Sequence, residues 1–269
     1  MICIILAVIA AVLIWAVIEN FGILLVKKTV LSEGLPQVKI MQISDCHGKN
    51  NRKYNKKITR AASREKPDAI FITGDLVSRY ETDFSACQSL LRQLGTIAPI
   101  YMCMGNHEQS LQPEVQPEFL GILRKNRVRL LRNERKRICL NGREFDLYGV
   151  EQKYTTYKKD GGYKDLDGFT LEEMNELLGE PSGDKVLLLA HNPLFAQVYA
   201  DWGADYVFSG HVHGGAVRLF GVGLLSPERK LFPKYSKGIY TIGKTKLAVS
   251  PGVGKLRLFN PPEVDFFII

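Results

Sequence analysis

The setting of the histidines constrains this chain more than any other feature of its sequence. Each of the five histidines ends a short apolar run and lies beside Gly, Asp or Asn. They are His47, His107, His191, His211 and His213. Short apolar runs bounded by such residues are typical of buried strands, and α/β proteins place ligand sites just beyond strand ends. The sequence therefore predicts strands whose ends carry a functional site.

The segment Gly210–Gly215 holds two of these histidines. It follows an apolar run, residues 206–209, that we expect to form a buried strand. In an extended segment, side chains two residues apart leave the same face, so His211 and His213 can point into one site. The flanking glycines allow a sharp turn and a close approach to a ligand. Taken alone, the pattern fits a metal site and a packed or solvated histidine pair equally well.

Four more strands with polar ends precede that segment. We expect them over residues 38–44, 69–73, 100–104 and 186–190. They lead into Asp45-Cys46-His47, Gly74-Asp75, Gly105-Asn106-His107 and His191-Asn192-Pro193. Helices are predicted between them, for example over residues 83–94, where apolar residues recur at helical spacing. Alternation of strand, loop and helix indicates a layered α/β fold.

After His213 the alternation of strands and helices ends, because the β-like runs there have no helical pattern between them. These runs cover residues 216–220, 238–242, 247–250, 256–259 and 264–268. The C-terminal half is therefore expected to be more antiparallel. Residues 152–168 are polar and rich in Gly and Tyr, and we expect an exposed loop there that can cover the site.

The polar groups at the strand ends form a mixed set of nitrogen and oxygen donors. Two carboxylates, one amide oxygen and four imidazoles are too many for one ion and suit two divalent cations. The predicted ligands are Asp45, His47, Asp75, Asn106, His191, His211 and His213. Two ions about 3.5–4 Å apart clamp a phosphoryl group and lower the pKa of a bridging water, which attacks as hydroxide. His107 is placed to protonate the leaving oxygen as a general acid.

Manganese(II) is the expected ion, and the same donors also accept Fe, Zn, Co or Ni. The alternative reading is that these side chains are ordinary polar ends of strands. It requires all five histidines, two aspartates and one asparagine to coincide by chance.

The order of these motifs resembles a known signature. Asp-x-His, Gly-Asp, Gly-Asn-His-Glu, a single His and Gly-His-x-His follow one another as in the calcineurin-like metallophosphoesterase superfamily. The blocks cover residues 38 to about 260. The apolar N-terminus, His191-Asn192-Pro193 and Gly210–Gly215 look like the bacterial membrane-anchored branch of that superfamily. The resemblance implies an α/β fold in which two mixed β-sheets form a sandwich flanked by helices.

The resemblance also implies a role for each matched residue. The first metal would be held by Asp45, His47, Asp75 and His213. Asp75 would bridge, and the second metal would be completed by Asn106, His191 and His211. His107 would be the acid that protonates the leaving group.

Three features differ from other members of the superfamily, and two of them argue against particular branches. Cys46 stands between Asp45 and His47 where Leu or Thr is usual, which should not affect ligation. The segment 74–79 lacks the Asp-Arg-Gly ending of protein serine/threonine phosphatases. No DNA-capping domain follows the core, which argues against the double-strand-break nuclease branch.

The N-terminal segment is apolar enough to cross a membrane. Residues 1–18 carry no charge, and Lys27 and Lys28 close the apolar stretch. We expect a retained transmembrane anchor over residues 1–28 and a catalytic domain over residues 29–269. A signal peptide is less favoured, since no basic residue precedes the run; a buried core helix is the other alternative. The two lysines slightly favour a cytoplasmic catalytic domain.

The net charge of +8 favours anionic partners. Cations gather over residues 49–57, which suits a solvated loop and, less well, phosphate attraction. They gather again over residues 124–143, which suits a solvated strand and turn or contact with anionic lipid. The five cysteines are scattered, so neither a disulfide framework nor a zinc finger is indicated.

The predicted function is hydrolysis of a phosphodiester or phosphomonoester at the membrane. The substrate would be a phosphorylated small molecule or lipid, with UDP-2,3-diacylglucosamine as one candidate from the resemblance. One alternative is a nuclease or cyclic-nucleotide phosphodiesterase, although nucleic acid is a less favoured partner. Another is a metal-holding binding module without turnover. No protein partner can be inferred.

Overall fold

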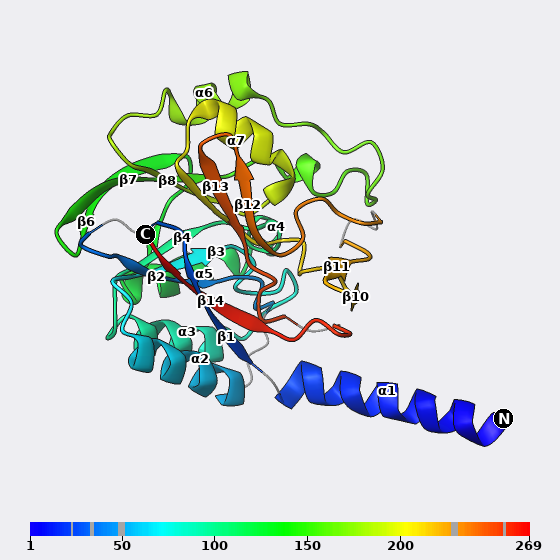
Figure 1. Ribbon diagram of the computed structural model, residues 1–269. Helices are drawn as coiled ribbons and strands as arrows, with labels where there is room; N and C mark the ends of the chain where they lie inside the picture. The colour runs from blue at the N-terminus through cyan, green and yellow to red at the C-terminus, as the bar shows by residue number, and fades with distance from the viewer. Residues whose placement is uncertain (23, 33–34, 48–51, 227–230, 255–256) are drawn as a thin grey trace.

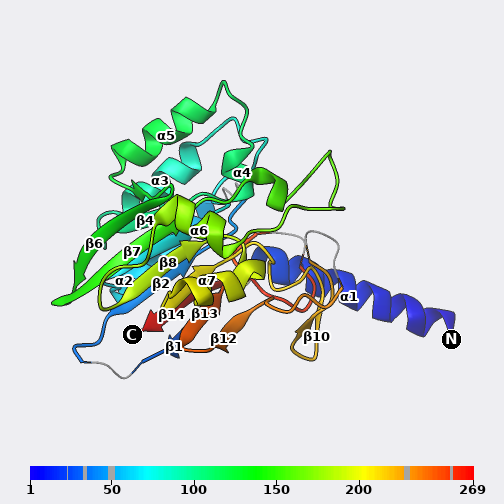
Figure 2. The same ribbon diagram turned by 90° about the horizontal axis from the view of Figure 1, so that it is seen from above.

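Strands with both faces buried form the centre of the molecule. In the computed structural model, which describes residues 1–22, 24–32, 35–47, 52–226, 231–254 and 257–269, two six-stranded sheets pack face to face. Every residue of β3 (Ala69–Thr73) and β8 (Val186–Ala190) is buried. Such continuous apolar strands belong in sheets that are covered on both sides. Helices provide the outer cover (Figures 1 and 2).

The first sheet has the strand order β1-β14-β2-β3-β4-β5. Its remaining strands are β1 (Leu25–Val30), β2 (Lys39–Ile43), β4 (Ile100–Cys103), β5 (Arg129–Leu130) and β14 (Glu263–Ile268). The strands from β2 to β5 run parallel, β14 is antiparallel to β2, and β1 is parallel to β14. The outer face of this sheet is covered by α2 (Arg52–Glu65), α3 (Ser85–Leu94) and α5 (Gln116–Lys125).

The second sheet has the order β12-β13-β9-β8-β7-β6. Its remaining strands are β6 (Glu134–Leu140), β7 (Arg143–Val150), β9 (Tyr206–Ser209), β12 (Gly238–Ile242) and β13 (Thr245–Val249). The four central strands run parallel, and the two outer strands are antiparallel to their neighbours. The outer face is covered by α6 (Leu171–Leu178) and α7 (Ala196–Trp202).

Alternation along each strand builds the layers, because successive side chains leave opposite faces. In β3, Phe71 points between the sheets, whereas Ile70 packs under the helices of the first sheet. In β8, Leu187 points between the sheets and Leu188 packs under α6 and α7. The ring of Phe71 meets that of Phe208 across the interface at 5.1 Å. The predicted α/β class with two mixed, helix-flanked sheets is confirmed.

Five short elements lie in the connections between the longer ones. They are α4 (Asn106–Gln109), η1 (Tyr154–Thr156), η2 (Pro193–Phe195), β10 (Arg218–Leu219) and β11 (Val222–Gly223). The loop expected over residues 152–168 is present apart from η1. The strand expected over 216–220 shrinks to the two residues of β10. The strand expected over 256–259 is wrong for its described residues, since only Leu258 forms an isolated bridge, with Val217.

The N-terminal segment forms one exposed helix, α1 (Ile2–Gly22), that projects away from the sheets (Figures 1 and 2). Its residues 2–20 have the length and composition of a membrane span, and 6% of that window is buried. Strand β1 follows at Leu25, so the segment expected to close the anchor at Lys28 pairs with β14 instead of extending the helix. The boundary of an anchor at residue 28 stays a prediction.

The structure shows the surroundings of the second basic region and of the cysteines. Part of the basic run over residues 49–57 lies outside the described residues. In the region 124–143, four arginines form ion pairs with carboxylates. They are Arg129, Arg132, Arg135 and Arg137. This favours the solvated-strand reading over lipid contact. Cys46, Cys87 and Cys103 are buried, whereas Cys3 and Cys139 are exposed.

Candidate metal centre

The ends of five strands from both sheets bring all eight predicted residues together. Asp45, Asp75, Asn106, His191 and the pair His211 and His213 follow β2, β3, β4, β8 and β9. Six of the eight line one cavity of about 270 Å³, and they are His47, Asp75, Asn106, His107, His211 and His213. The other two, Asp45 and His191, are fully buried and contact this lining. Carboxyl ends of parallel strands share an edge, which explains the convergence.

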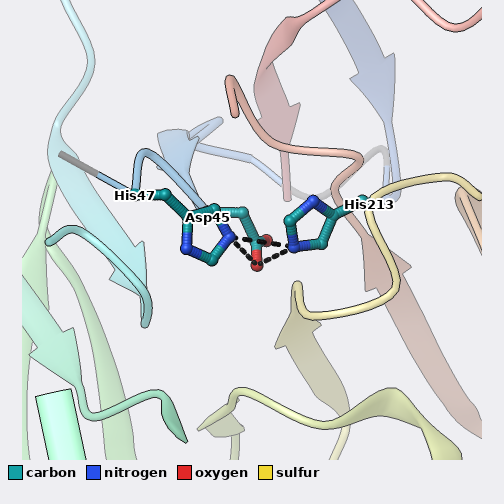
Figure 3. A group of neighbouring side chains, drawn as sticks. All are labelled: Asp45, His47 and His213. Carbon is teal, nitrogen blue, oxygen red and sulfur yellow. Dashed lines mark hydrogen bonds and ion pairs between the residues drawn. The ribbon is translucent and has the colours of Figure 1, made fainter. Parts of the chain in front are cut away.

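Asp45, His47 and His213 form one group whose ligand atoms lie within 4.8 Å of one another. Figure 3 shows both imidazoles pointing at the Asp45 carboxylate. The His47 Nε2 and His213 Nε2 atoms are 2.9 Å apart. Two nitrogen ligands about 2.1 Å from one metal at a right angle would lie about 3 Å apart. The spacing therefore fits two ligands of one ion.

A second group of the same dimension contains Asp75, His191 and His211. The Asp75 Oδ2 atom lies 3.4 Å from His191 Nε2 and 3.9 Å from His47 Nε2. Asp75 thus stands between the two groups. Its other oxygen, Oδ1, accepts the backbone N–H of His107 at 2.8 Å, which fixes the carboxylate in place.

Unpaired acceptors mark the second group as a place for a cation. The buried atoms Asn106 Oδ1 and His191 Nε2 have no hydrogen-bond partner. His191 Nδ1 lies 2.7 Å from the carbonyl of Thr73, so it must carry the proton of that bond. Nε2 then faces Asp75 Oδ2 at 3.4 Å, a position that a proton takes in the metal-free protein and that a cation can take instead. The buried Asn106 Oδ1 still has no donor, which is costly, and a metal ion would satisfy it.

The proton positions of the neighbouring histidines follow from similar reasoning. The backbone N–H of Arg79 donates to His107 Nδ1 at 3.2 Å. In neutral His107 the proton therefore resides on Nε2. His47 Nδ1 also approaches His107 Nδ1, at 3.3 Å, and can donate to it. This arrangement leaves the Nε2 lone pair of His47 free for its own group.

Five of the seven predicted ligands occupy the left-handed region of backbone conformation. Their φ angles are 51° at Asp45, 49° at His47, 53° at Asp75, 67° at His211 and 55° at His213. Each such conformation costs a non-glycine residue about 1–3 kcal/mol, and such residues cluster at functional sites. The turns after β2, β3 and β9 are thus strained where they present these side chains to the site.

Two glycines permit the close approach of these turns. A Cβ atom on Gly105 would lie 2.2 Å from Asp75 Oδ1. One on Gly210 would lie 1.9 Å from Ser44 Oγ and 2.3 Å from Asp45 Oδ2. Any larger residue at either position would push a carboxylate out of place.

The pKa values of His47 and His213, in the first group, suit metal ligation. Burial lowers the pKa of His47 to about 3 and holds that of His213 well below its ordinary value. Both are therefore neutral at pH 7, as metal ligands must be. Burial also disfavours charged His191, but the carboxylates of Asp75 and Asp45 and the Thr73 carbonyl together outweigh it and raise the pKa of His191 to about 10. The second group thus attracts positive charge strongly.

Several supporting residues were missed by the sequence reasoning. Glu108 is fully buried and accepts the backbone N–H groups of Asp75, Val77 and Gly105. The Tyr157 ring packs on His211 at 4.9 Å. The motif Gly-Asn-His-Glu contained Glu108, so its position was a usable signal. Tyr157 gave none, since it lies in an irregular loop.

The mouth of the cavity is polar and cationic. Besides the predicted residues it is lined by Arg79, Tyr157, Lys158 and Tyr163. Three of these belong to the loop that follows η1, as expected for a segment that covers the site. The Arg79 guanidinium donates to the Tyr154 hydroxyl at 2.8 Å, which ties it to the same loop.

Residues 38–215, which contain every residue of this site, match the calcineurin-like phosphoesterase family. The chain belongs to this family of metal-dependent phosphoesterases. An uncharacterized metallophosphoesterase of Aquifex aeolicus is 30% identical over 257 residues, which are 92% of each chain. The family match therefore agrees with the motif signature in the sequence and with the observed fold.

Two further relatives carry a stated activity. Phosphodiesterase YaeI of Escherichia coli is 29% identical, over 74% of this chain and 69% of its own. UDP-2,3-diacylglucosamine pyrophosphatase LpxG of Chlamydia muridarum is 25% identical, over 95% of this chain and 92% of its own. Among solved structures, the NAD nucleotidase NadN of Haemophilus influenzae superposes with a TM-score of 0.52 at 13% identity, over 81% of this chain and 45% of its own.

Proposed function

We propose that this protein hydrolyses phosphoesters with two divalent metal ions, manganese(II) first among them. The observation that carries the proposal is a pair of neighbouring ligand groups, with Asp75 a member of the second and its Oδ2 atom 3.9 Å from His47 Nε2 of the first. Asp45, His47 and His213 would hold one ion with Asp75. Asn106, His191 and His211 would hold the other, with Asp75 between them. When bound, the ions supply a water of lowered pKa and neutralise phosphoryl charge.

His107 is the proposed general acid. Its Nδ1 accepts the Arg79 backbone N–H, so Nε2 is the atom that gives the proton to the leaving oxygen. Burial lowers the pKa of His107 to about 4, which makes it neutral in the free site at pH 7. An anionic phosphoester in the cavity opposes that shift. We infer that His107 gains its proton together with the substrate.

The cations at the mouth fit an anionic substrate. Arg79 and Lys158 both line the cavity. Arg79 lies in the turn after β3 and Lys158 in the loop after η1. A phosphodiester, a phosphomonoester and a pyrophosphate all carry the charge that these groups attract. The activities of YaeI and LpxG make diesters and nucleotide-sugar pyrophosphates, UDP-2,3-diacylglucosamine included, the first substrates to test.

The proposed location is a membrane, with α1 as a single-pass anchor. The helix is apolar, and its residues 2–18 are largely exposed. Lys27 and Lys28 directly after it favour a catalytic domain on the cytoplasmic face.

The test is metal-dependent hydrolysis by the full chain in detergent. The protein is stripped with chelator, reloaded with Mn²⁺, and assayed on bis-p-nitrophenyl phosphate and on p-nitrophenyl phosphate, with bound metal counted. Restored cleavage of the diester supports a phosphodiesterase, and cleavage of the monoester alone supports a phosphatase. Two bound ions without cleavage of either would replace the enzyme proposal by a metal-holding binding module.

A further inference from the structure

Exposed apolar side chains gather on one part of the catalytic domain. Beyond α1 and β1, six large hydrophobic residues in neighbouring segments have exposures between 40% and 103%. They are Leu219, Phe220, Val222, Leu231, Phe232 and Phe259, which we call the hairpin patch. Phe220 is fully exposed at the turn between β10 and β11. A soluble surface rarely carries such a concentration unless something covers it.

Backbone contacts join the segments of the hairpin patch. The backbone N–H of Phe232 donates to Leu224 O at 3.1 Å, which holds the 231–232 segment beside the hairpin. Val217, at the base of the hairpin, forms a bridge with Leu258. The segments that carry the patch are therefore adjacent.

The hairpin patch is also attached to the end of α1. The backbone N–H of Phe259 donates to Glu19 Oε2 at 2.7 Å. Glu19 is completely buried, although it lies in an otherwise exposed apolar helix. Any bilayer that surrounds α1 therefore begins next to the patch.

Both views of the molecule show the same arrangement. In Figures 1 and 2, α1, the β10–β11 hairpin and the loop after η1 all extend toward the right-hand side. The β6–β7 hairpin, with its paired arginines, extends toward the opposite side. Strand β6, which carries these cations, thus lies on the side away from α1, whereas the β10–β11 hairpin lies on the side to which α1 extends.

We propose that the hairpin patch inserts into the lipid surface from which α1 emerges, as a second membrane contact. The inference rests on the proposed role of α1 as an anchor. Phe220 follows His213 by seven positions, so the chain between them spans at most about 25 Å. The contact therefore holds the metal centre within that distance of the lipid headgroups. A lipid surface is favoured over a protein partner, because a bilayer around α1 would already occupy the adjacent space.

The test measures contact between position 220 and acyl chains. The full chain with Trp15→Phe and Phe220→Trp is reconstituted into phosphatidylcholine vesicles with or without brominated acyl chains. Trp202, which is 3% exposed, stays as a constant background. The matched control replaces Phe220→Trp by Leu35→Trp, since Leu35 is 84% exposed and its neighbour Pro36 accepts a hydrogen bond from Arg143 of the β6–β7 hairpin. The unsubstituted chain, through Trp15, reports in parallel that α1 is inside the bilayer.

We expect brominated lipid to reduce the emission of the tryptophan introduced at position 220 at least twofold. The emission of the tryptophan introduced at position 35 should stay unchanged. Quenching of Trp15 in the unsubstituted chain, without quenching in the Phe220→Trp variant, would overturn the proposal. A blue-shifted emission from position 220 that is lost on dilution, without quenching, would also overturn it and assign the patch to a second copy of the chain.

A separate readout keeps the membrane contact distinct from the proposed function. The same vesicles are assayed for hydrolysis of bis-p-nitrophenyl phosphate. Quenching without hydrolysis would remove the enzyme proposal and leave the membrane contact standing. Hydrolysis without quenching would do the reverse.

Discussion

Asn20 and Arg257 exchange two hydrogen bonds across 237 residues of sequence. Asn20 Nδ2 donates to Arg257 O at 2.7 Å, and the Arg257 backbone N–H donates to Asn20 Oδ1 at 3.1 Å. The Arg257 guanidinium then donates to His213 O at 3.2 Å. The end of the apolar helix is thereby linked through one buried arginine to a predicted metal ligand.

This link predicts that Asn20 supports the site as well as the helix. Asn20→Leu leaves the buried backbone groups of Arg257 unpaired, which should cost about 1–3 kcal/mol of unfolding free energy. Denaturant unfolding of the full chain in detergent measures it, and metal counting shows whether the group of His213 loosens. Gln93→Leu is the control, because the exposed side chain of Gln93 bonds to Ser89 of the same helix. Equal stability of the two variants would contradict the link.

Gly105 offers a sharp test of how the carboxylate of Asp75 is held. In Gly105→Ala the new Cβ would collide with Asp75 Oδ1, so we expect loss of metal binding and at least a tenfold loss of turnover. Gly121→Ala is the matched control, since its Cβ would meet nothing closer than 3.9 Å. Because Gly121 lies in α5, that change should stabilise the protein by up to about 1 kcal/mol. Full metal occupancy in Gly105→Ala would refute the packing argument.

Single substitutions should separate metal binding, assigned to Asp75, from proton donation, assigned to His107. His107→Ala should keep both metal ions and lose about 10²–10⁴-fold in turnover, as expected when a general acid is removed. Asp75→Ala should lose both ions. The defect of His107→Ala should be smaller for p-nitrophenolate than for an alkoxide leaving group, since the former needs less protonation. Normal turnover of the alkyl ester by His107→Ala would show that the acid is another group.

The lowered pKa values of His47 and His107 predict a pH dependence of the metal-free protein. Between the ordinary value of 6.5 and their folded values of about 3 and about 4, the unfolded chain binds protons that the folded chain does not. The free energy of unfolding should therefore fall as pH falls through this window, by at most about 1.4 kcal/mol per pH unit for each histidine. Denaturant unfolding in chelator, compared with His47→Gln/His107→Gln, isolates this contribution. Parallel pH profiles of the two proteins would rule it out.

Lys158 tests the role assigned to the cationic mouth. Lys158→Ala should raise KM several-fold with little change in kcat, since the ammonium attracts the substrate without entering the reaction. Lys164→Ala is the control, because Lys164 belongs to the same loop but does not line the cavity. Steady-state kinetics on bis-p-nitrophenyl phosphate compares the two, and an unchanged KM in Lys158→Ala would remove the lysine from substrate binding.

The sequence alone was enough to predict the strands that carry the site. Strands such as 186–190 and 206–209 were predicted with their observed bounds, because an uninterrupted apolar run with a polar end is a local signal. Strand β1 was missed because it lacks this local signal. Its sequence Leu25–Val30 is half exposed at a sheet edge and continues an apolar helix, so no local pattern separates it.

The candidate donors of the site could likewise be listed from the residues, since imidazole, carboxylate and amide oxygen are metal donors in any fold. Which donors meet was decided only by the tertiary structure. Asp45 shares a group with His213, and Asp75 with His191, although more than a hundred residues separate the members of each pair. The bond between Asn20 and Arg257 and the position of the hairpin patch beside α1 have the same origin. Each depends on two distant segments at once, whereas a sequence pattern reports only on the residues that carry it.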